Sequence, residues 1–317
     1  MKNRRLIAKL LSLAMIFALM IPAPVAAKSS KGGKLVKSVT EYRYNETKAR
    51  WEKASKTNFT YNKKAYPKEI KDTYYSYYFF GIPTDASVDV TTAKYKFKGK
   101  TPKSMKLKNS AGVVIQTRKY KKGRLTSITS TSKNSWDDDK GYNIGNGVTS
   151  ISYNKKGLAV YSVNNSNDTS VYGDGTSRTG NGTTARMFAV THKKGIPSRI
   201  VRTTTDNSTT VWSDDPTPDT WSSTNMAYTN FNKKGLTIES GYFDSTTQQP
   251  KASYIIQYKN KKGNVKTATV FEVKDNGTTV PVWMYSFKYN KTKISKARYF
   301  NMINSIVGYH NAFFNWF

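Results

Sequence analysis

Paired lysines recur along the chain inside short polar stretches that favour tight turns, as in Tyr153-Asn154-Lys155-Lys156-Gly157-Leu158. An ammonium group on a flexible stem acts as a point charge, which suits a polymer of phosphates or carboxylates better than a unique small ligand. We therefore predict that the doublets act together as a polyanion-binding edge: Lys63 and Lys64, Lys121 and Lys122, Lys155 and Lys156, Lys193 and Lys194, Lys233 and Lys234, and Lys261 and Lys262. The alternative is that each doublet is only a solvated hairpin tip whose charge discourages aggregation.

Aromatic residues in long polar segments form a second group of binding candidates. The segments 132–147, 164–182 and 206–225 combine Asp, Asn and Ser with large rings. Such rings can stack on the apolar faces of sugars, while neighbouring Asp and Asn side chains bond to hydroxyl groups. We predict a glycan-binding role, or else packing under the residues' own loops, for Trp136, Tyr172, Trp212 and Trp221.

Residues suited to catalysis are scarce. The chain has two histidines, of which His192 occupies a turn and His310 lies in the apolar pattern of the tail. Glu239 and Glu272 are the only carboxylate pair suited to glycosidase chemistry, and they follow their turns at different offsets. Asp137 to Asp139 could offer oxygen ligands to calcium but lack the spacing of a known calcium loop. We therefore predict no catalytic residue, no metal site and no cofactor.

The elements that must position these residues are β-hairpins. In the recurring stretch, Asn favours the start of a type I turn and Gly supplies a left-handed residue that forms a bulge into the next strand. Seven copies are recognisable: Tyr61 to Ala65, Tyr120 to Gly123, Tyr153 to Gly157, Thr191 to Gly195, Phe231 to Gly235, Tyr258 to Gly263, and Tyr289 to Lys293. Their unequal spacing predicts a fixed hairpin joined by loops of free length.

These hairpin motifs support a family resemblance. Tyr153-Asn154-x-x-Gly157-Leu158, Phe231-Asn232-x-x-Gly235-Leu236 and Gly123-Arg124-Leu125-Thr126 resemble the tyrosine-aspartate (YD) repeats of secreted bacterial wall-associated and toxin-shell proteins. The resemblance covers roughly residues 110 to 295, with Asn in place of the usual Asp. It implies long antiparallel sheets of hairpins that spiral into shells, and carbohydrate binding in some members.

The hydrophobic pattern predicts an all-β fold. Trp283, Tyr285, Phe287 and Tyr289 alternate with Met284, Ser286 and Lys288, as in antiparallel strands with one wetted face. Roughly a dozen or more strands would form one large curved or two-layered meander sheet. The apolar residues of 299–317 recur every three or four positions, which predicts a short C-terminal helix that caps the last sheet edge. A membrane-surface helix, a terminal strand and disorder are the alternatives.

The N-terminus predicts export. Residues 1–27 have the basic start, the apolar core and the small-residue cleavage site of a secretory signal peptide, and we expect no transmembrane span. The chain contains no cysteine, which excludes disulfides and thiolate chemistry. Because the signal peptide carries four of the basic residues and no acid, +28 of the formal +32 net charge remains in the mature chain. Such a charge attracts polyanions.

These features together predict a secreted, non-catalytic, cell-surface binding or structural protein. Its expected partner is an anionic cell-wall polymer or polysaccharide, with non-specific binding to extracellular nucleic acid as a further option. The alternatives are a secreted carbohydrate-active enzyme (a glycoside hydrolase or lyase) and the repeat shell of a toxin-like protein. The expected organisation is a signal peptide (1–27), a disordered basic leader (28–37), a β-rich segment (38–90), a hairpin-repeat domain (91–298) and an amphipathic tail (299–317).

Overall fold

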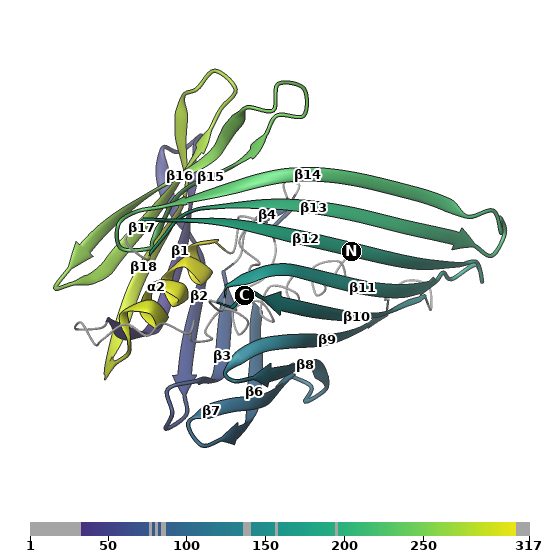
Figure 1. Ribbon diagram of the computed structural model, residues 1–317, viewed down its shortest axis with the longest axis horizontal. Coiled ribbons are helices and arrows are strands. Elements are labelled where there is room, and N and C mark those ends of the chain that lie inside the picture. Colours follow the sequence, from purple (N-terminus) through teal and green to yellow (C-terminus); the bar gives the residue numbers. More distant parts are fainter. Residues whose placement is uncertain are drawn as a thin grey trace. The chain divides into compact units, whose positions relative to one another are not determined.

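The structure of the protein is a computed structural model, which describes residues 33–75, 78–79, 82–83, 87–135, 141–155, 158–193 and 196–308. The expected signal peptide, His310 and the rest of the predicted tail beyond residue 308 lie outside these residues. The described elements are strands and one C-terminal helix (Figure 1).

The strands are β1 (Lys34–Asn45), β2 (Arg50–Tyr61), β3 (Pro67–Tyr74), β4 (Tyr78–Phe79), β5 (Ile82–Pro83), β6 (Ser87–Lys98), β7 (Thr101–Lys108), β8 (Val114–Lys121), β9 (Arg124–Ser135), β10 (Tyr142–Tyr153), β11 (Ala159–Val171), β12 (Ser177–Lys193), β13 (Ile196–Trp212), β14 (Asp219–Phe231), β15 (Thr237–Phe243), β16 (Pro250–Lys261), β17 (Asn264–Val273) and β18 (Thr279–Lys293). The helix is α2 (Lys296–Val307).

The main sheet is closed. Sixteen strands are hydrogen-bonded in chain order, β4 and β5 form a separate pair, and β1 pairs with β18 to complete a barrel. The closing pair is antiparallel, with Val39 opposite Phe287 and Tyr42 opposite Met284. The all-β antiparallel prediction is confirmed, and the sheet predicted to be curved or two-layered is a closed barrel. Closure satisfies the two edge strands that a long meander would otherwise expose.

The described residues divide into two compact units, each with its own buried side chains. One unit comprises Lys94–Ala189 and Val201–Met226, and the other comprises 33–93, Val190–Ile200 and 227–308. In the first unit Met105, Leu107 and Leu125 are buried. In the second, Ile70, Leu236 and Tyr285 are buried, together with residues of α2.

The Asn-x-x-Gly turns have the predicted geometry. In the turn between β14 and β15, Gly235 N–H donates to Asn232 O at 2.8 Å, Gly235 has φ +83°, and Asn232 Oδ1 accepts from Lys234 N and Leu236 N. The copies of different length depart from this pattern. Lys122 and Gly123 both have positive φ, as do Lys262 and Gly263, which is the geometry of a two-residue type I′ hairpin.

Helix α2 confirms the predicted C-terminal helix but begins before the expected tail. Ser295 caps its N-terminus by accepting from Arg298 N, and its face of Tyr299, Met302, Ile303, Ile306 and Val307 is buried. Asn304 Nδ2 donates to Gly235 O at 2.7 Å, and Asn304 Oδ1 accepts from Thr237 N at 3.0 Å. Because the sheet closes on itself, the helix covers hairpin ends instead of an open edge.

The N-terminal strand corrects one further expectation. β1 begins at Lys34, inside the segment predicted to be a disordered leader. Leu35 and Val36 are both buried between the exposed Lys34 and Lys37, and distant residues hold the start of the strand: Ile294 N–H donates to Gly33 O at 2.9 Å, and Asn264 Oδ1 accepts from Lys34 N. These contacts join residues that are more than 200 positions apart.

Candidate functional site

Three neighbouring strands of the first unit present a continuous set of lysines on their outward face. On β6, Lys94, Lys96 and Lys98 are exposed, while the intervening Tyr95 and Phe97 are half-buried and stack on each other with ring centroids 5.8 Å apart. The alternation follows from the strand period of two, which sends successive side chains to opposite faces. We call the following exposed residues of β6, β7 and β8 the basic face: Lys94, Lys96, Lys98, Lys103, Lys106, Lys108, Lys119 and Lys121.

The opposite face of the same strands carries their buried side chains. On β7, Leu107 is buried between the exposed Lys106 and Lys108, and on β8, Tyr120 is buried between Lys119 and Lys121. Arg118 also lies on this inner face, where its Nε donates to Gln116 Oε1 and burial lowers the pKa of the guanidinium. The apolar alternation therefore fixes which side chains point outward, and on these strands they are mostly lysines.

No carboxylate of this stretch offsets the charge. Residues 94–133 contain eleven lysines and two arginines, and the sequence has no Asp or Glu between Asp89 and Asp137. All eleven lysines are exposed. Elsewhere among the described residues lysines do form ion pairs, such as Lys251 with Asp275 at 2.8 Å and Lys274 with Glu272 at 2.7 Å. The basic face is therefore a concentration of uncompensated positive charge.

The spacing of these charges makes them act together. Outward residues two positions apart on one strand lie about 6.8 Å apart, and neighbouring strands lie about 4.8 Å apart. Both separations are below the Debye length of about 10 Å at 0.1 M salt, so the potentials of neighbouring lysines overlap. A polyanion laid on this face would meet several ammonium groups at once.

The predicted lysine doublets lie at hairpin ends. Lys156 and Lys194 are outside the described residues, and the other ten are exposed: Lys63, Lys64, Lys121, Lys122, Lys155, Lys193, Lys233, Lys234, Lys261 and Lys262. The turn geometry does not require them, because Asn109-Ser110-Ala111-Gly112 forms the same turn, with Gly112 N–H donating to Asn109 O at 3.0 Å. The proposal that the doublets form one binding edge remains a prediction.

The candidate aromatic residues are not brought together as one site. Trp136 lies outside the described residues. Tyr172, in the turn after β11, stacks on Trp212 at the end of β13, with centroids 5.8 Å apart and planes 17° apart. Trp221 is separate from this pair, lies within β14 instead of a loop, and is 56% exposed.

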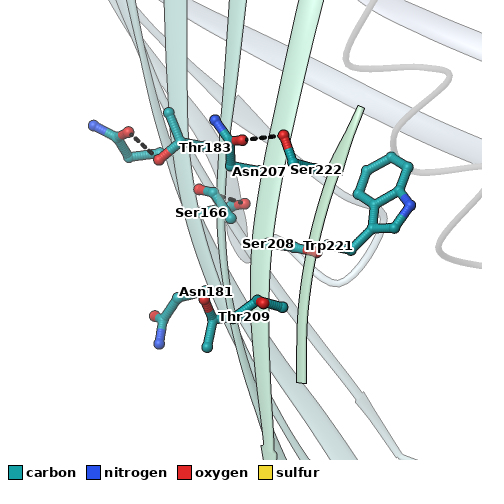
Figure 2. Close-up of a pocket in the computed structure, with 11 residues that line it drawn as sticks. Ser166, Asn181, Thr183, Asn207, Ser208, Thr209, Trp221 and Ser222 are labelled. Atoms are coloured by element: carbon teal, nitrogen blue, oxygen red, sulfur yellow. Dashed lines mark hydrogen bonds between the residues drawn. The ribbon is translucent and has the colours of Figure 1, made fainter. Parts of the chain in front are cut away.

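An open groove of about 570 Å³ crosses β11 to β14 in the first unit and includes Trp221 (Figure 2). Its polar residues are cross-linked along the sheet: Ser222 Oγ donates to Asn207 Oδ1 at 2.7 Å, and Thr183 Oγ1 donates to Asn165 Oδ1 at 3.1 Å. In Figure 2 the Trp221 ring points away from the side on which Asn207 and Ser222 meet. The lining side chains thus belong to both faces of the sheet and do not converge on one ligand.

The candidate catalytic residues have ordinary structural partners. Glu239 Oε1 accepts from Asn230 Nδ2 at 3.0 Å, and Glu272 pairs with Lys274. They lie on β15 and β17, neither lines the groove, and His192 is exposed near the end of β12. Within the described ranges, no cluster of three or more His, Asp or Glu side chains is arranged to hold a metal ion.

The lysine doublets at the turns were identified from the sequence, whereas the basic face formed by lysines on the strands was not. The alternations Lys94-Tyr95-Lys96-Phe97-Lys98 and Lys106-Leu107-Lys108 could have indicated it, because each places lysines on one face and apolar side chains on the other. The absence of acidic residues over the same stretch is a second signal that needs no structure.

Comparison with known proteins assigns no family to this chain. No protein-family model matches the sequence, and no curated protein matches it. Among solved structures, a porin-like protein from Bacteroides uniformis is similar, with a TM-score of 0.46 and 11% identity over 81% of this chain and 99% of that chain. In the described part of the chain, no helix combines the length and the apolar character needed to cross a bilayer.

Proposed function

We propose that this protein binds anionic polymers outside the cell, without catalysing a reaction, and that the basic face is the binding surface. The observation that carries the proposal is the set of outward lysines on β6, β7 and β8, within a stretch that has no acidic residue. The predicted signal peptide and the cysteine-free sequence agree with an extracellular location.

Solubility alone does not account for where the lysines lie. Within the first unit, exposed positions farther along the sheet include neutral polar residues, such as Ser150 and Ser152 on β10 and Thr179 and Asn181 on β12. Neutral side chains therefore suffice to keep this kind of strand in water. Within this unit, the charge is instead concentrated on three adjacent strands, as a binding surface for a polyanion requires.

The same face is unsuited to contact with lipid. The outer surface of a membrane barrel is an apolar band, and a lysine on that surface costs about 2–4 kcal/mol near the bilayer midplane. Lys94, Lys96 and Lys106 lie inside their strands, each two or more residues from the nearer strand end, and are exposed. We infer that the outward face of β6 to β8 meets water and soluble or wall-bound polymers.

The test is a charge-neutral variant of the basic face, in which Lys94, Lys96, Lys106 and Lys119 become Gln. A matched control removes the same charge from exposed strand positions of the other unit, at Lys68, Lys71, Lys259 and Lys266. Binding to poly(glycerol phosphate) and to polygalacturonate is measured by titration calorimetry over a salt series. Dextran serves as the uncharged polymer.

We expect the slope of log K against log salt to fall by about 3 in the basic-face variant, since each neutralised phosphate of a flexible polyanion contributes about 0.7. The control variant should keep most of the slope. Equal losses in both variants would show that net charge acts without a defined surface. Binding to dextran as tight as to the anionic polymers would contradict the proposal altogether.

A further inference from the structure

Aromatic rings are missing from the outward side of the basic face. On β6, Tyr95 and Phe97 belong to the opposite set of alternating positions, and on β8, Tyr120 is buried. The large exposed aromatic side chains of the first unit, among its described residues, are Tyr142, Tyr161, Trp212 and Trp221, which lie on β10, β11, β13 and β14. A base laid on the basic face would thus find lysine stems and no π surface.

The two arginines of residues 94–133 also do not contribute to the basic face. Arg118 is fully buried, and Arg124, on β9, lies over the Tyr153 ring at 5.7 Å from its centroid. Arginine is the side chain that stacks on bases and holds a phosphate with two parallel hydrogen bonds, whereas lysine supplies a point charge. The basic face therefore attracts negative charge but offers no side chain that stacks on a planar group such as a base.

Proteins that bind single-stranded nucleic acid without sequence preference combine a basic groove with aromatic platforms on which successive bases stack. The basic face has the first part of this combination and lacks the second. The groove described above lies across β11 to β14 and is lined by no lysine. The two features are therefore on different strands.

We propose that the ligand of the basic face is a linear, non-aromatic polyanion, such as an alditol phosphate polymer or an acidic polysaccharide, which is bound through its charges alone. This inference rests on the proposed function. The phosphate or carboxylate repeat supplies the whole attraction, and nucleic acid binds only as strongly as its backbone charge allows.

The test compares oligomers that differ only in their bases. A thymidine oligonucleotide and an abasic oligomer with the same sugar-phosphate backbone and length are titrated into the wild-type protein at about 0.1 M salt. Poly(glycerol phosphate) and polygalacturonate with matched numbers of charges distinguish a phosphate polymer from a carboxylate polymer. The four-lysine Gln variant of the basic face is titrated with each.

We expect the two oligomers to bind within about twofold of each other and the Gln variant to weaken all four ligands together, since no contact to a base exists to be lost. Thymidine oligomer affinity that exceeds abasic affinity by about fivefold or more, the least that one stacked base contributes, would overturn the inference and leave polyanion binding intact. Failure of all four ligands to bind would instead remove the proposed function itself.

Discussion

Asp72 is a buried carboxylate. It is 3% exposed on β3, Thr57 Oγ1 donates to its Oδ1, and Asp89 stands directly opposite it on β6. Its Oδ2 is buried without a hydrogen-bond partner among the described residues. Burial, with the charges of Asp89 and Glu41 nearby, raises the pKa of Asp72 to about 7.

This raised pKa predicts that Asp72 weakens the fold as pH rises. Between about pH 4 and pH 7 the folded chain holds a proton that the unfolded chain has released, so the free energy of unfolding falls across this window. At pH 8 Asp72 is ionised in the folded protein, and the resulting reduction in the free energy of unfolding reaches its full value of up to about 4 kcal/mol. Asp72→Asn should therefore be more stable than wild type at pH 8 and nearly equal to it at pH 4, as measured by urea unfolding. Asp275→Asn, at an exposed site, is the control, and a gain for Asp72→Asn that is the same at both pH values would contradict this account.

Gly241 is a second position where the local packing restricts the residue type, because a single added Cβ atom would clash with backbone. A Cβ at Gly241 would lie 2.0 Å from Lys251 O and 2.9 Å from Ala252 Cα, at a register shift between β15 and β16. Because both contacts are with backbone, Gly241→Ala should destabilise the protein by about 4 kcal/mol or more. Gly182→Ala is the matched control, since its Cβ would meet the Ser166 hydroxyl at 3.2 Å and Asn207 O at an ordinary contact distance of 3.7 Å. Similar melting temperatures for the two variants would show that β16 shifts readily.

At the scale of elements, α2 is joined to the turn between β14 and β15 by one side chain. Asn304→Ala removes the bonds to Gly235 O and Thr237 N and leaves both backbone groups without this partner. We expect a loss of about 1–3 kcal/mol in chemical unfolding. Asn301→Ala, one turn earlier on the helix, should cost less than about 0.5 kcal/mol because it lacks such contacts, and an equal cost for the two would assign the effect to helix propensity.

The lysines of the hairpin turns allow an effect on binding to be distinguished from an effect on stability. Replacing Lys63 and Lys64, Lys233 and Lys234, and Lys261 and Lys262 with Ser should change the melting temperature little, because the Asn109 turn forms without lysine. If the doublets form a binding edge, the salt slope for poly(glycerol phosphate) should fall as it does in the basic-face variant. A slope unchanged from wild type would limit the binding surface to the strands.

These elements also show what the sequence could predict. The turns were predictable because Asn232 and Gly235 act over four residues, and strand alternation was predictable because Tyr285 and Phe287 follow a period of two. Two features depend on distant partners and were not predictable in this way. The pairing of Val39 with Phe287 joins residues near the two ends of the described chain, and the burial of Leu35 and Val36 places a strand where the sequence predicts a disordered leader.

The whole molecule carries a strong positive charge, which predicts an effect of salt on its stability. Lysines of the basic face repel one another, and ions screen that repulsion. Raising sodium chloride from about 20 to 200 mM should raise the melting temperature of the wild-type protein by a few degrees. The rise should be smaller in the basic-face Gln variant than in the matched control variant when both are followed by circular dichroism. Identical salt responses of the two variants would show that the basic face is not the main source of the repulsion.

The closure of the barrel has a consequence for how the protein is made. Most strands pair with the next strand along the chain and can form as soon as a hairpin has emerged, but β1 must wait for β18. Val39 and Phe287 are 248 positions apart, so this pairing is the least local in the sheet and carries the largest loop-closure entropy. Until the last strand has been synthesised, β1 remains an unpaired edge able to recruit other chains. The slow and aggregation-sensitive stage of folding is thus set by the arrival of residues 279–293.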